Sequence, residues 1–257
     1  MSTRGPNIIL RNLSRHYGAV KAVDKLSLEI KSGSLVALVG LSGSGKSTLL
    51  KMINRLVTPD AGDVFIGDEN ILDVDLHILR RRIGYVFQNI GLFPHMNIAR
   101  NIAIGLELVG ATNGIEDRVS ILLDLVELPR EMAIRMPDQL SGGQQQRAGV
   151  ARALATRPGL MLMDEPFGAL DPVTRDNLAN RYKILHEKLG LTTMIVTHDM
   201  AEALYLADRI LVMDGGQIKA DATPAEMLAG TAGAEAEKLV AIPRAQAEQL
   251  HDLSNQS

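Results

Sequence analysis

Gly40-Leu41-Ser42-Gly43-Ser44-Gly45-Lys46-Ser47-Thr48 is the stretch of sequence that decides the fold. It fits the pattern G-x-x-x-x-G-K-[ST], follows the apolar run 35–39, and precedes Leu49, Ile53 and Leu56 at helical spacing. A strand, a glycine-rich loop and a helix in this order predict a phosphate-binding loop. The glycines allow consecutive backbone N–H groups to point at one phosphate chain, and the helix N-terminus adds partial positive charge.

The loop also supplies the side chains that phosphate chemistry needs. Lys46 is expected to reach the β- and γ-phosphates of a nucleotide, and the Ser47 hydroxyl is expected to hold Mg²⁺. A glycine-rich turn without chemical meaning is the alternative, and the flanking strand and helix argue against it. The residues predicted to bind the nucleotide here are Gly40, Ser42, Gly43, Ser44, Gly45, Lys46, Ser47 and Thr48.

The composition excludes several classes of protein. The chain has 257 residues, of which 46% are hydrophobic, which is enough for a sizeable core. A net charge of −3 and an aromatic content of 3% give no sign of a nucleic-acid surface, so no nucleic-acid partner is expected. The absence of cysteine excludes disulfides and thiolate metal ligands. No apolar run is long enough to span a membrane, and the polar start does not read as a signal peptide, so a cytoplasmic location is expected.

Apolar runs on both sides of the loop predict an α/β core with an inserted helical region. Between residues 89 and 158 helical patterns dominate, and no strand is expected there. Asp214-Gly215-Gly216 is expected to join two strands as a hairpin. Strands are predicted over 8–13, 26–30, 64–66, 83–87, 160–163, 193–196, 210–213 and 217–220.

One long helix is predicted from its end signals. Asp171 is a good N-cap, Pro172 suits the first helical position, and Gly190 ends the apolar pattern. The apolar face of this helix is expected to be Leu178, Tyr182, Leu185 and Leu189.

Three further motifs narrow the chemistry. Leu140-Ser141-Gly142-Gly143-Gln144 places a hydroxyl and two glycine amides at the start of a polar helix, which is a second potential anion cradle. Asp164-Glu165 follows a buried apolar strand, and Thr197-His198-Asp199 follows another. Taken singly, these read as a helix cap and two polar strand ends. Together with a phosphate loop, the set closely resembles the ATP-binding cassette (ABC) ATPases.

The resemblance extends from residue 8 to about residue 228 and implies a fold. That fold is a P-loop NTPase core of the ABC ATPase type, with N-terminal antiparallel strands and an inserted α-helical subdomain. The ABC ATPase domain is expected over residues 1–229. Its core is placed at about 1–88 and 159–229, its helical subdomain at about 89–158, and a partly helical or disordered tail at 230–257.

The family pattern also implies catalytic roles for single residues. Asp164 matches the acidic residue that orients Mg²⁺, and Glu165 matches the general base for the attacking water. His198 matches the switch histidine, which is expected to touch the γ-phosphate and Glu165. Gln88 matches the Q-loop glutamine, which senses Mg²⁺ and water. The expected catalytic residues are thus Glu165, His198, Gln88 and Lys46, and the expected metal ligands are Ser47, Gln88 and Asp164.

The remaining matches concern ATP binding and a dimer. In ABC ATPases each ATP lies between the phosphate loop of one subunit and the signature motif of another, so the resemblance implies a head-to-tail dimer, expected to be a homodimer. The signature residues are Ser141, Gly142, Gly143 and Gln144, and Asp171 matches the D-loop at the interface. N-capping is the simpler role for Asp171. Tyr17 matches the aromatic residue that stacks on adenine, and packing against the sheet is its alternative.

The resemblance further implies transport partners. Because no membrane span is found, separate permease subunits are expected to dock on the helical subdomain at the cytoplasmic face of the cell membrane, with a solute-binding protein in the full system. Leu92, Phe93 and Met96 are candidates for an apolar docking groove, and filling the subdomain core is the alternative. Residues 51–56, 83–96, 163–172 and 197–200 look like ATPases of bacterial glycine betaine, choline or carnitine uptake.

Three other functions are alternatives to this interpretation. They are an importer ATPase for another solute such as an amino acid, a soluble ABC protein outside transport, and a nucleotide-binding regulator without hydrolysis. A single cassette without heptad arms disfavours the second alternative, and Glu165 and His198 disfavour the third. Several betaine-type relatives carry paired regulatory modules after the ATPase, and the residues after Leu228 are expected to be too few for them.

Overall fold

A six-stranded sheet forms the centre of the protein. We describe residues 4–241, 244 and 245 of a computed structural model. The strand order is β10-β9-β3-β8-β7-β6, and all neighbours are parallel except β10, which pairs antiparallel with β9. The strands are β3 (Leu35–Val39), β6 (Ile83–Val86), β7 (Leu160–Asp164), β8 (Thr192–Val196), β9 (Arg209–Asp214) and β10 (Gln217–Ala222).

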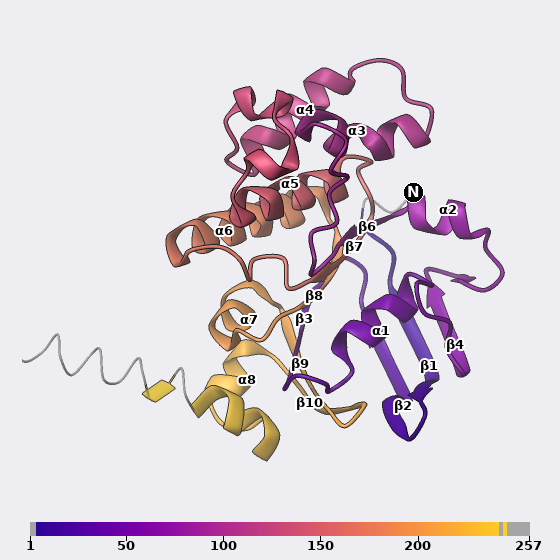
Figure 1. The fold of residues 1–257 in the computed structure, drawn as a ribbon. Helices are drawn as coiled ribbons and strands as arrows, with labels where there is room; N and C mark the ends of the chain where they lie inside the picture. The colour runs from indigo at the N-terminus through magenta and orange to yellow at the C-terminus, as the bar shows by residue number, and fades with distance from the viewer. Residues whose placement is uncertain (1–3, 242–243, 246–257) are drawn as a thin grey trace, which may run out of the picture.

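The N-terminal part forms a second, antiparallel sheet of order β2-β1-β4-β5 (Figure 1). In its register Ile8 of β1 lies opposite both Ile30 of β2 and Ile66 of β4. The predicted strands here were too short at their ends, and β5 was missed because two residues carry no readable pattern. The strands are β1 (Ile8–Tyr17), β2 (Val20–Ile30), β4 (Ala61–Ile66) and β5 (Glu69–Asn70).

Helices surround the two sheets and form a separate helical region. Helix α1 contacts both sheets, through β2 on one side and β7 and β8 on the other. Between β6 and β7 every regular element is helical, and this region lies at the top of Figure 1. Its helices are α3 (Ile98–Leu108), α4 (Ile115–Leu125), η1 (Arg130–Ile134), η2 (Pro137–Gln139) and α5 (Gly142–Leu154). The others are α1 (Lys46–Ile53), α2 (Leu76–Arg81), α6 (Pro172–Leu189), α7 (Met200–Leu206) and α8 (Pro224–Leu228).

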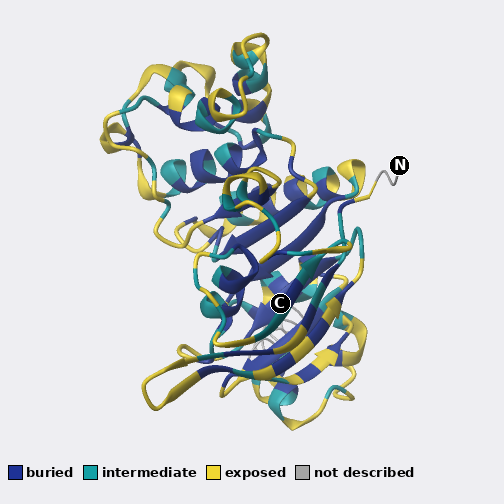
Figure 2. Cartoon of the chain, turned by 90° about the vertical axis from the view of Figure 1, so that its right-hand side faces the viewer, coloured by how far each residue is buried: buried dark blue, intermediate teal, exposed yellow. Residues whose placement is uncertain are grey.

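The hydrophobic core lies on both faces of the central sheet, whose parallel strands are almost wholly buried (Figure 2), while β10 at its edge is half exposed. Alternate residues of one strand face opposite sides of a sheet. In β3, Leu35, Ala37 and Val39 therefore join one apolar cluster with the helical region, while Val36 and Leu38 join another with the antiparallel sheet. This two-sided burial explains why the parallel strands are continuous apolar runs in the sequence.

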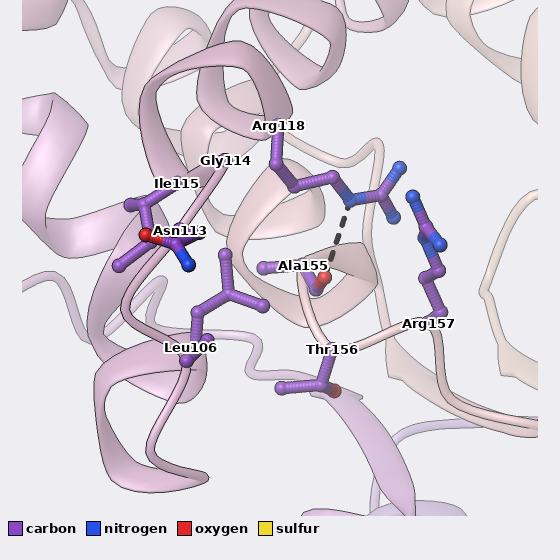
Figure 3. A pocket seen from close by; sticks show the side chains of 9 residues that line it. Leu106, Asn113, Gly114, Ile115, Arg118, Ala155, Thr156 and Arg157 are labelled. Atoms are coloured by element: carbon purple, nitrogen blue, oxygen red, sulfur yellow. Dashed lines mark hydrogen bonds between the residues drawn. The ribbon is translucent and has the colours of Figure 1, made fainter.

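Polar side chains hold the helical region together. Asn101 is fully buried and its amide donates to the carbonyls of Phe93, Met96 and Asn97, which fixes the loop before α3. Arg118 of α4 donates to the carbonyls of Leu154 and Ala155 at 2.7 and 3.2 Å, beside a pocket of about 250 Å³ (Figure 3). These carbonyls at the end of α5 have no partner within the helix, so Arg118 joins α4 to α5.

Two details of the predicted helices were wrong. Leu56 is not part of the first helix, which ends at Ile53, and its side chain is 38% exposed. Leu189 is 42% exposed, and His186 completes the inner face of α6 instead. The His186 Nδ1 atom lies 3.0 Å from the Thr193 hydroxyl of β8, so the last turn presents a polar side chain to the sheet.

The start of the predicted tail is ordered. Residues 234–241 are helical, and Ala236 and Val240 are buried against the core. The disordered end predicted for the tail lies at residues 246–257, outside the described residues. Among the described residues, no helix combines the length and apolarity that crossing a membrane requires.

Candidate nucleotide-binding site

The glycine-rich loop connects the carboxyl end of β3 to α1, as the sequence predicts. Gly40 has φ 148° and Gly45 has φ 107°, conformations that side chains other than glycine rarely adopt. A Cβ atom at Gly40 would lie 2.1 Å from the Met213 carbonyl oxygen, and one at Gly45 would lie 1.9 Å from that of Ala22. Neither position leaves room for a side chain, so both glycines are required for this shape.

Lys46 is the first residue of α1 and is only 7% exposed. Its ammonium group donates to the carbonyls of Gly40 and Leu41 at 2.7 and 2.8 Å, and so closes the loop on itself. Burial lowers the pKa of Lys46, and the charges of Glu165 and Asp164 act in the opposite direction. An anion placed in the loop would compensate this buried charge.

Ser47 and Asp164 form the oxygen pair expected for a metal. The Ser47 hydroxyl donates to Asp164 Oδ1 at 2.9 Å, across the gap between α1 and the end of β7. Asp164 is 2% exposed, and burial raises the pKa of its carboxyl group while the Ser47 hydrogen bond lowers it. A buried carboxylate of this kind favours a nearby cation.

Glu165 and His198 face each other at the ends of neighbouring strands. Because β7 and β8 are parallel, their carboxyl ends lie at the same edge of the sheet. His198 Nδ1 lies 3.4 Å from Glu165 Oε2, and the His198 side chain is 67% exposed while that of Glu165 is 26% exposed. The backbone of Glu165 is left-handed, with φ 49°. These two predicted catalytic residues are therefore brought together.

Gln88 lies on a large cleft beside this cluster. The cleft measures about 750 Å³ and is formed by residues of α1, α2, α3, α5 and the loop after β6. Gln88 and Asp164 both line it, together with Phe87 and Phe93. The structure thus brings the predicted Q-loop glutamine and the predicted metal ligand to one cavity.

The signature residues lie in a different part of the molecule, at the start of α5. Ser141 is the N-cap, and its hydroxyl accepts from the Gln144 backbone N–H at 3.3 Å. The Gln144 side chain accepts from the Ser141 N–H at 2.9 Å, which completes a capping box. Gly142 and Gly143 form the first turn of this helix. The motif therefore forms a capped helix N-terminus in the helical region, whereas the phosphate loop follows β3 of the central sheet.

The last two predicted binding residues are exposed. Asp171 caps α6 by accepting from the Thr174 N–H at 3.0 Å, and this hydrogen bond lowers the pKa of its carboxyl group. Tyr17 ends β1 and is 48% exposed. The guanidinium group of Arg15 lies 4.8 Å from the centre of the Tyr17 ring.

The motif analysis missed Gln146, which is 3% exposed within α5. Its side-chain amide contacts the backbone on both sides of the turn that carries Glu165. A run of three glutamines does not show which one points inward. The helical period could have predicted that Gln146 is buried, because it shares its helix face with Val150 and Ala153 at positions i+4 and i+7.

A buried polar group lies beneath the His198 loop. The Thr197 hydroxyl donates to Glu202 Oε2 at 3.2 Å, and Arg175 pairs with Asp199 at 2.9 Å. Glu202 Oε1 is buried and has no hydrogen-bond partner among the residues that the structure describes. Burial raises the pKa of Glu202 to about 7.

This carboxyl group makes stability depend on pH. Between pH 4.5, the ordinary pKa of the group, and about 7 the folded chain holds a proton that the unfolded chain has released. Stability from this group is therefore complete below the unfolded pKa and is lost as pH rises through the folded pKa. Glu202→Gln should raise the free energy of unfolding by about 2 kcal/mol at about pH 8 and by much less at about pH 5. Urea unfolding at both pH values measures the difference, and an equal effect at both would contradict the assignment.

Comparison with known proteins decides the family. The family model described as "ABC transporter" matches residues 23–168, which is more than half of the chain. The chain belongs to the ABC transporter family. It resembles the choline transport ATP-binding protein OpuBA of Bacillus subtilis (strain 168), with 48% identity over 239 residues, 92% of this chain and 63% of the relative. It also resembles the glycine betaine uptake system ATP-binding protein YehX of Escherichia coli (strain K12), with 50% identity over 218 residues, 84% of this chain and 71% of the relative.

A solved ABC cassette has the same fold. A dimeric ATP-binding cassette in a post-hydrolysis state, bound to ADP and Pi, matches with a TM-score of 0.78 and 35% identity. The match covers 84% of this chain and 98% of the solved one. The predicted resemblance to ABC ATP-binding subunits and the predicted α/β fold are confirmed. The chain spans less than two thirds of the OpuBA relative, at 63% of its length.

Proposed function

We propose that the chain is the ATP-hydrolysing subunit of an ABC importer for a quaternary-amine osmoprotectant such as glycine betaine, choline or carnitine. One observation carries the enzymatic part. Ser47, Asp164, Glu165 and His198 converge at the carboxyl ends of three adjacent parallel strands, beside a glycine-rich loop that lacks room for side chains. The names of the related choline and glycine betaine systems support the solute class.

ATP would place its phosphates in the glycine-rich loop. The backbone N–H groups at the start of α1 and the buried ammonium of Lys46 provide positive charge there. Lys46 now donates to two loop carbonyls, and its flexible stem allows it to turn toward the β- and γ-phosphates. Tyr17 is exposed at the end of β1, where one face of its ring is available to adenine.

The residues present fit Mg²⁺. Mg²⁺ is usually held by one or two protein oxygens together with phosphates and waters. Ser47 Oγ and the buried Asp164 carboxylate are such a pair, and Gln88 shares their cleft. When bound, Mg²⁺ would neutralise charge on the phosphates.

Hydrolysis needs a base that orients water. Glu165 extends from the strand that ends in Asp164, so its carboxylate can accept a proton from a water near the γ-phosphate. The His198 Nδ1 atom lies 3.4 Å from this carboxylate, close enough to help orient it. When ATP is bound, the exposed His198 ring can also donate a hydrogen bond to a γ-phosphate oxygen. The negative charge of that phosphate then lies beside the Glu165 carboxylate.

The second half of each site would come from another copy of the chain. The signature turn at Ser141 presents a helix N-terminus with open space beside Gly142. A head-to-tail homodimer would bring this turn to the γ-phosphate of the partner, with Asp171 at the interface. The dimeric state of the similar solved cassette supports this arrangement.

The 750 Å³ cleft is the proposed docking site for a permease subunit. Phe87 and Phe93 line it and are 39% and 41% exposed, and Leu108, at 62%, lies at its edge. Leu92, also predicted for the groove, packs instead against the core, because its side chain points into the helical region. Docking here would hold the chain at the cytoplasmic face of the membrane, with a solute-binding protein completing the importer.

Phe93→Asp should weaken the association of the chain with its permease while leaving ATP hydrolysis nearly unchanged. A charge in the cleft would oppose an apolar permease helix, whereas the phosphate loop would be unchanged. We expect the fraction of the chain that sediments with membranes of the source cells to fall about tenfold. Phosphate release by the purified variant should stay within about twofold of wild type. Tyr205→Asp, at a 52% exposed aromatic residue on α7, is the matched control. Equal sedimentation of both variants would contradict the docking site.

A further inference from the structure

A buried side chain of α5 makes hydrogen bonds to the turn that carries Glu165. Gln146 Nε2 donates to the Glu165 carbonyl oxygen at 2.7 Å, and the Ala169 backbone N–H donates to Gln146 Oε1 at 2.8 Å. One amide thus bridges both ends of the turn from Glu165 to Ala169. Because the side chain is 3% exposed, water cannot replace these hydrogen bonds easily.

The turn needs such support because Glu165 has an unusual backbone conformation. Its φ of 49° is costly for a residue with a side chain, and such strain persists only where surrounding contacts hold it. The Glu165 N–H donates to the Val196 carbonyl at 2.9 Å, and the Gly168 N–H donates to the Glu165 carbonyl at the long distance of 3.3 Å. The shorter bond from Gln146 is therefore the stronger of the two that orient this carbonyl.

The same helix also holds the loop beside the docking cleft. Arg152 donates to the carbonyls of Ile90 and Gly91 at 2.8 and 2.6 Å, in the loop that follows Gln88. Helix α5 is therefore joined to the Glu165 turn near its start and to the Q-loop near its end. The neighbouring Gln145 differs, because among the described residues its amide donates to the carbonyls of Pro137 and Leu140, both inside the helical region.

We infer that Gln146 is a positioning residue for ATP hydrolysis: it fixes the backbone of Glu165 so that the carboxylate meets the attacking water. The inference rests on the proposed ATPase function. The Gln146 amide contacts the backbone of Glu165 and Ala169, so its effect on hydrolysis passes through the turn. Its loss should let the Glu165 side chain leave the attacking geometry while the phosphate loop stays intact, so kcat should fall and ATP binding should not.

Steady-state phosphate release by purified wild type, Gln146→Met and Gln145→Met tests this. Both variants are in α5, and each removes one side-chain amide that makes two hydrogen bonds to backbone groups. Of the two amides, that of Gln146 contacts the Glu165 turn. We expect Gln146→Met to lower kcat by about 10- to 100-fold with KM changed less than about threefold. Gln145→Met should keep kcat within about twofold. Equal kcat values for the two variants, corrected for the folded fraction seen by circular dichroism, would overturn the inference.

Gln146→Glu keeps the test valid if the methionine variant folds poorly. A protonated glutamic acid can donate to the Glu165 carbonyl and accept from the Ala169 N–H as glutamine does, whereas the carboxylate cannot donate. Because position 146 is buried, desolvation should raise the pKa of the introduced carboxyl group above its ordinary value. The ratio of its kcat to that of wild type should therefore rise several-fold as the pH falls from about 8 to about 6. A ratio independent of pH would contradict the role. Wild type that releases no phosphate would overturn the proposed function itself, whereas active wild type with an equally active Gln146→Met overturns this inference alone.

Discussion

Replacing Glu165 with glutamine should lower the kcat of ATP hydrolysis by about 100- to 1,000-fold. Glutamine keeps the size of the side chain and cannot accept a proton from the attacking water. The phosphate loop, Ser47 and Asp164 are untouched by the change, so the variant should still bind MgATP with nearly the affinity of wild type. Loss of hydrolysis without loss of binding should trap the ATP-bound dimer.

Two measurements separate these effects. Phosphate release reports kcat, and size-exclusion chromatography with MgATP reports the trapped dimer, while EDTA should abolish both. Glu187→Gln, at an exposed carboxylate of α6, is the control and should behave like wild type. If Glu165→Gln hydrolyses ATP as fast as wild type, Glu165 is not the base and the assigned catalytic cluster is wrong.

Lys46→Ala should weaken ATP binding by at least about 100-fold. The variant removes the only ammonium that lies within the glycine-rich loop, where charge-assisted hydrogen bonds contribute about 1.5–3 kcal/mol each. It also leaves the carbonyls of Gly40 and Leu41 without their donor, so the loop should lose part of its shape. Both effects act on binding as well as on turnover, which distinguishes this variant from Glu165→Gln.

Titration with a fluorescent ATP analogue measures this loss directly. Lys219→Ala is a suitable control, because Lys219 is an exposed residue of β10 whose ammonium donates to the Gln217 side chain on the same strand. The control should bind the analogue with the affinity of wild type. An unchanged Kd for Lys46→Ala would mean that the glycine-rich loop does not hold the phosphates.

The parts of the fold and site that could be predicted are those in which local sequence carries the physical requirement. The parallel strands are buried on both faces, so apolar runs such as 160–163 identify them. Gly40 and Gly45 occupy conformations and spaces that only glycine fits, so they form a readable motif. Asp164 ends such a strand and Glu165 directly follows it, so their placement at the sheet edge follows from the topology.

The parts that could not be predicted depend on contacts between distant segments. Nothing near Gln146 in the sequence shows that its amide meets the backbone of Glu165 and Ala169. Leu189 keeps the helical period of α6, yet the His186 side chain takes the inner face instead, where it forms a hydrogen bond with Thr193. A period shows which side of a helix is apolar, and only the folded chain shows where polar groups find partners.

The central claim is that hydrolysis at Glu165 drives uptake of a quaternary amine. Uptake of radiolabelled glycine betaine at high osmolarity tests it most directly. The source cells would lack this chain and their other betaine carriers, and would be rescued with wild type or with Glu165→Gln at equal expression. We predict that wild type restores uptake and that Glu165→Gln leaves it at the level of the deletion. Equal uptake by the deletion and the wild-type rescue would contradict the claim for betaine, and full rescue by Glu165→Gln would contradict the coupling of hydrolysis to transport.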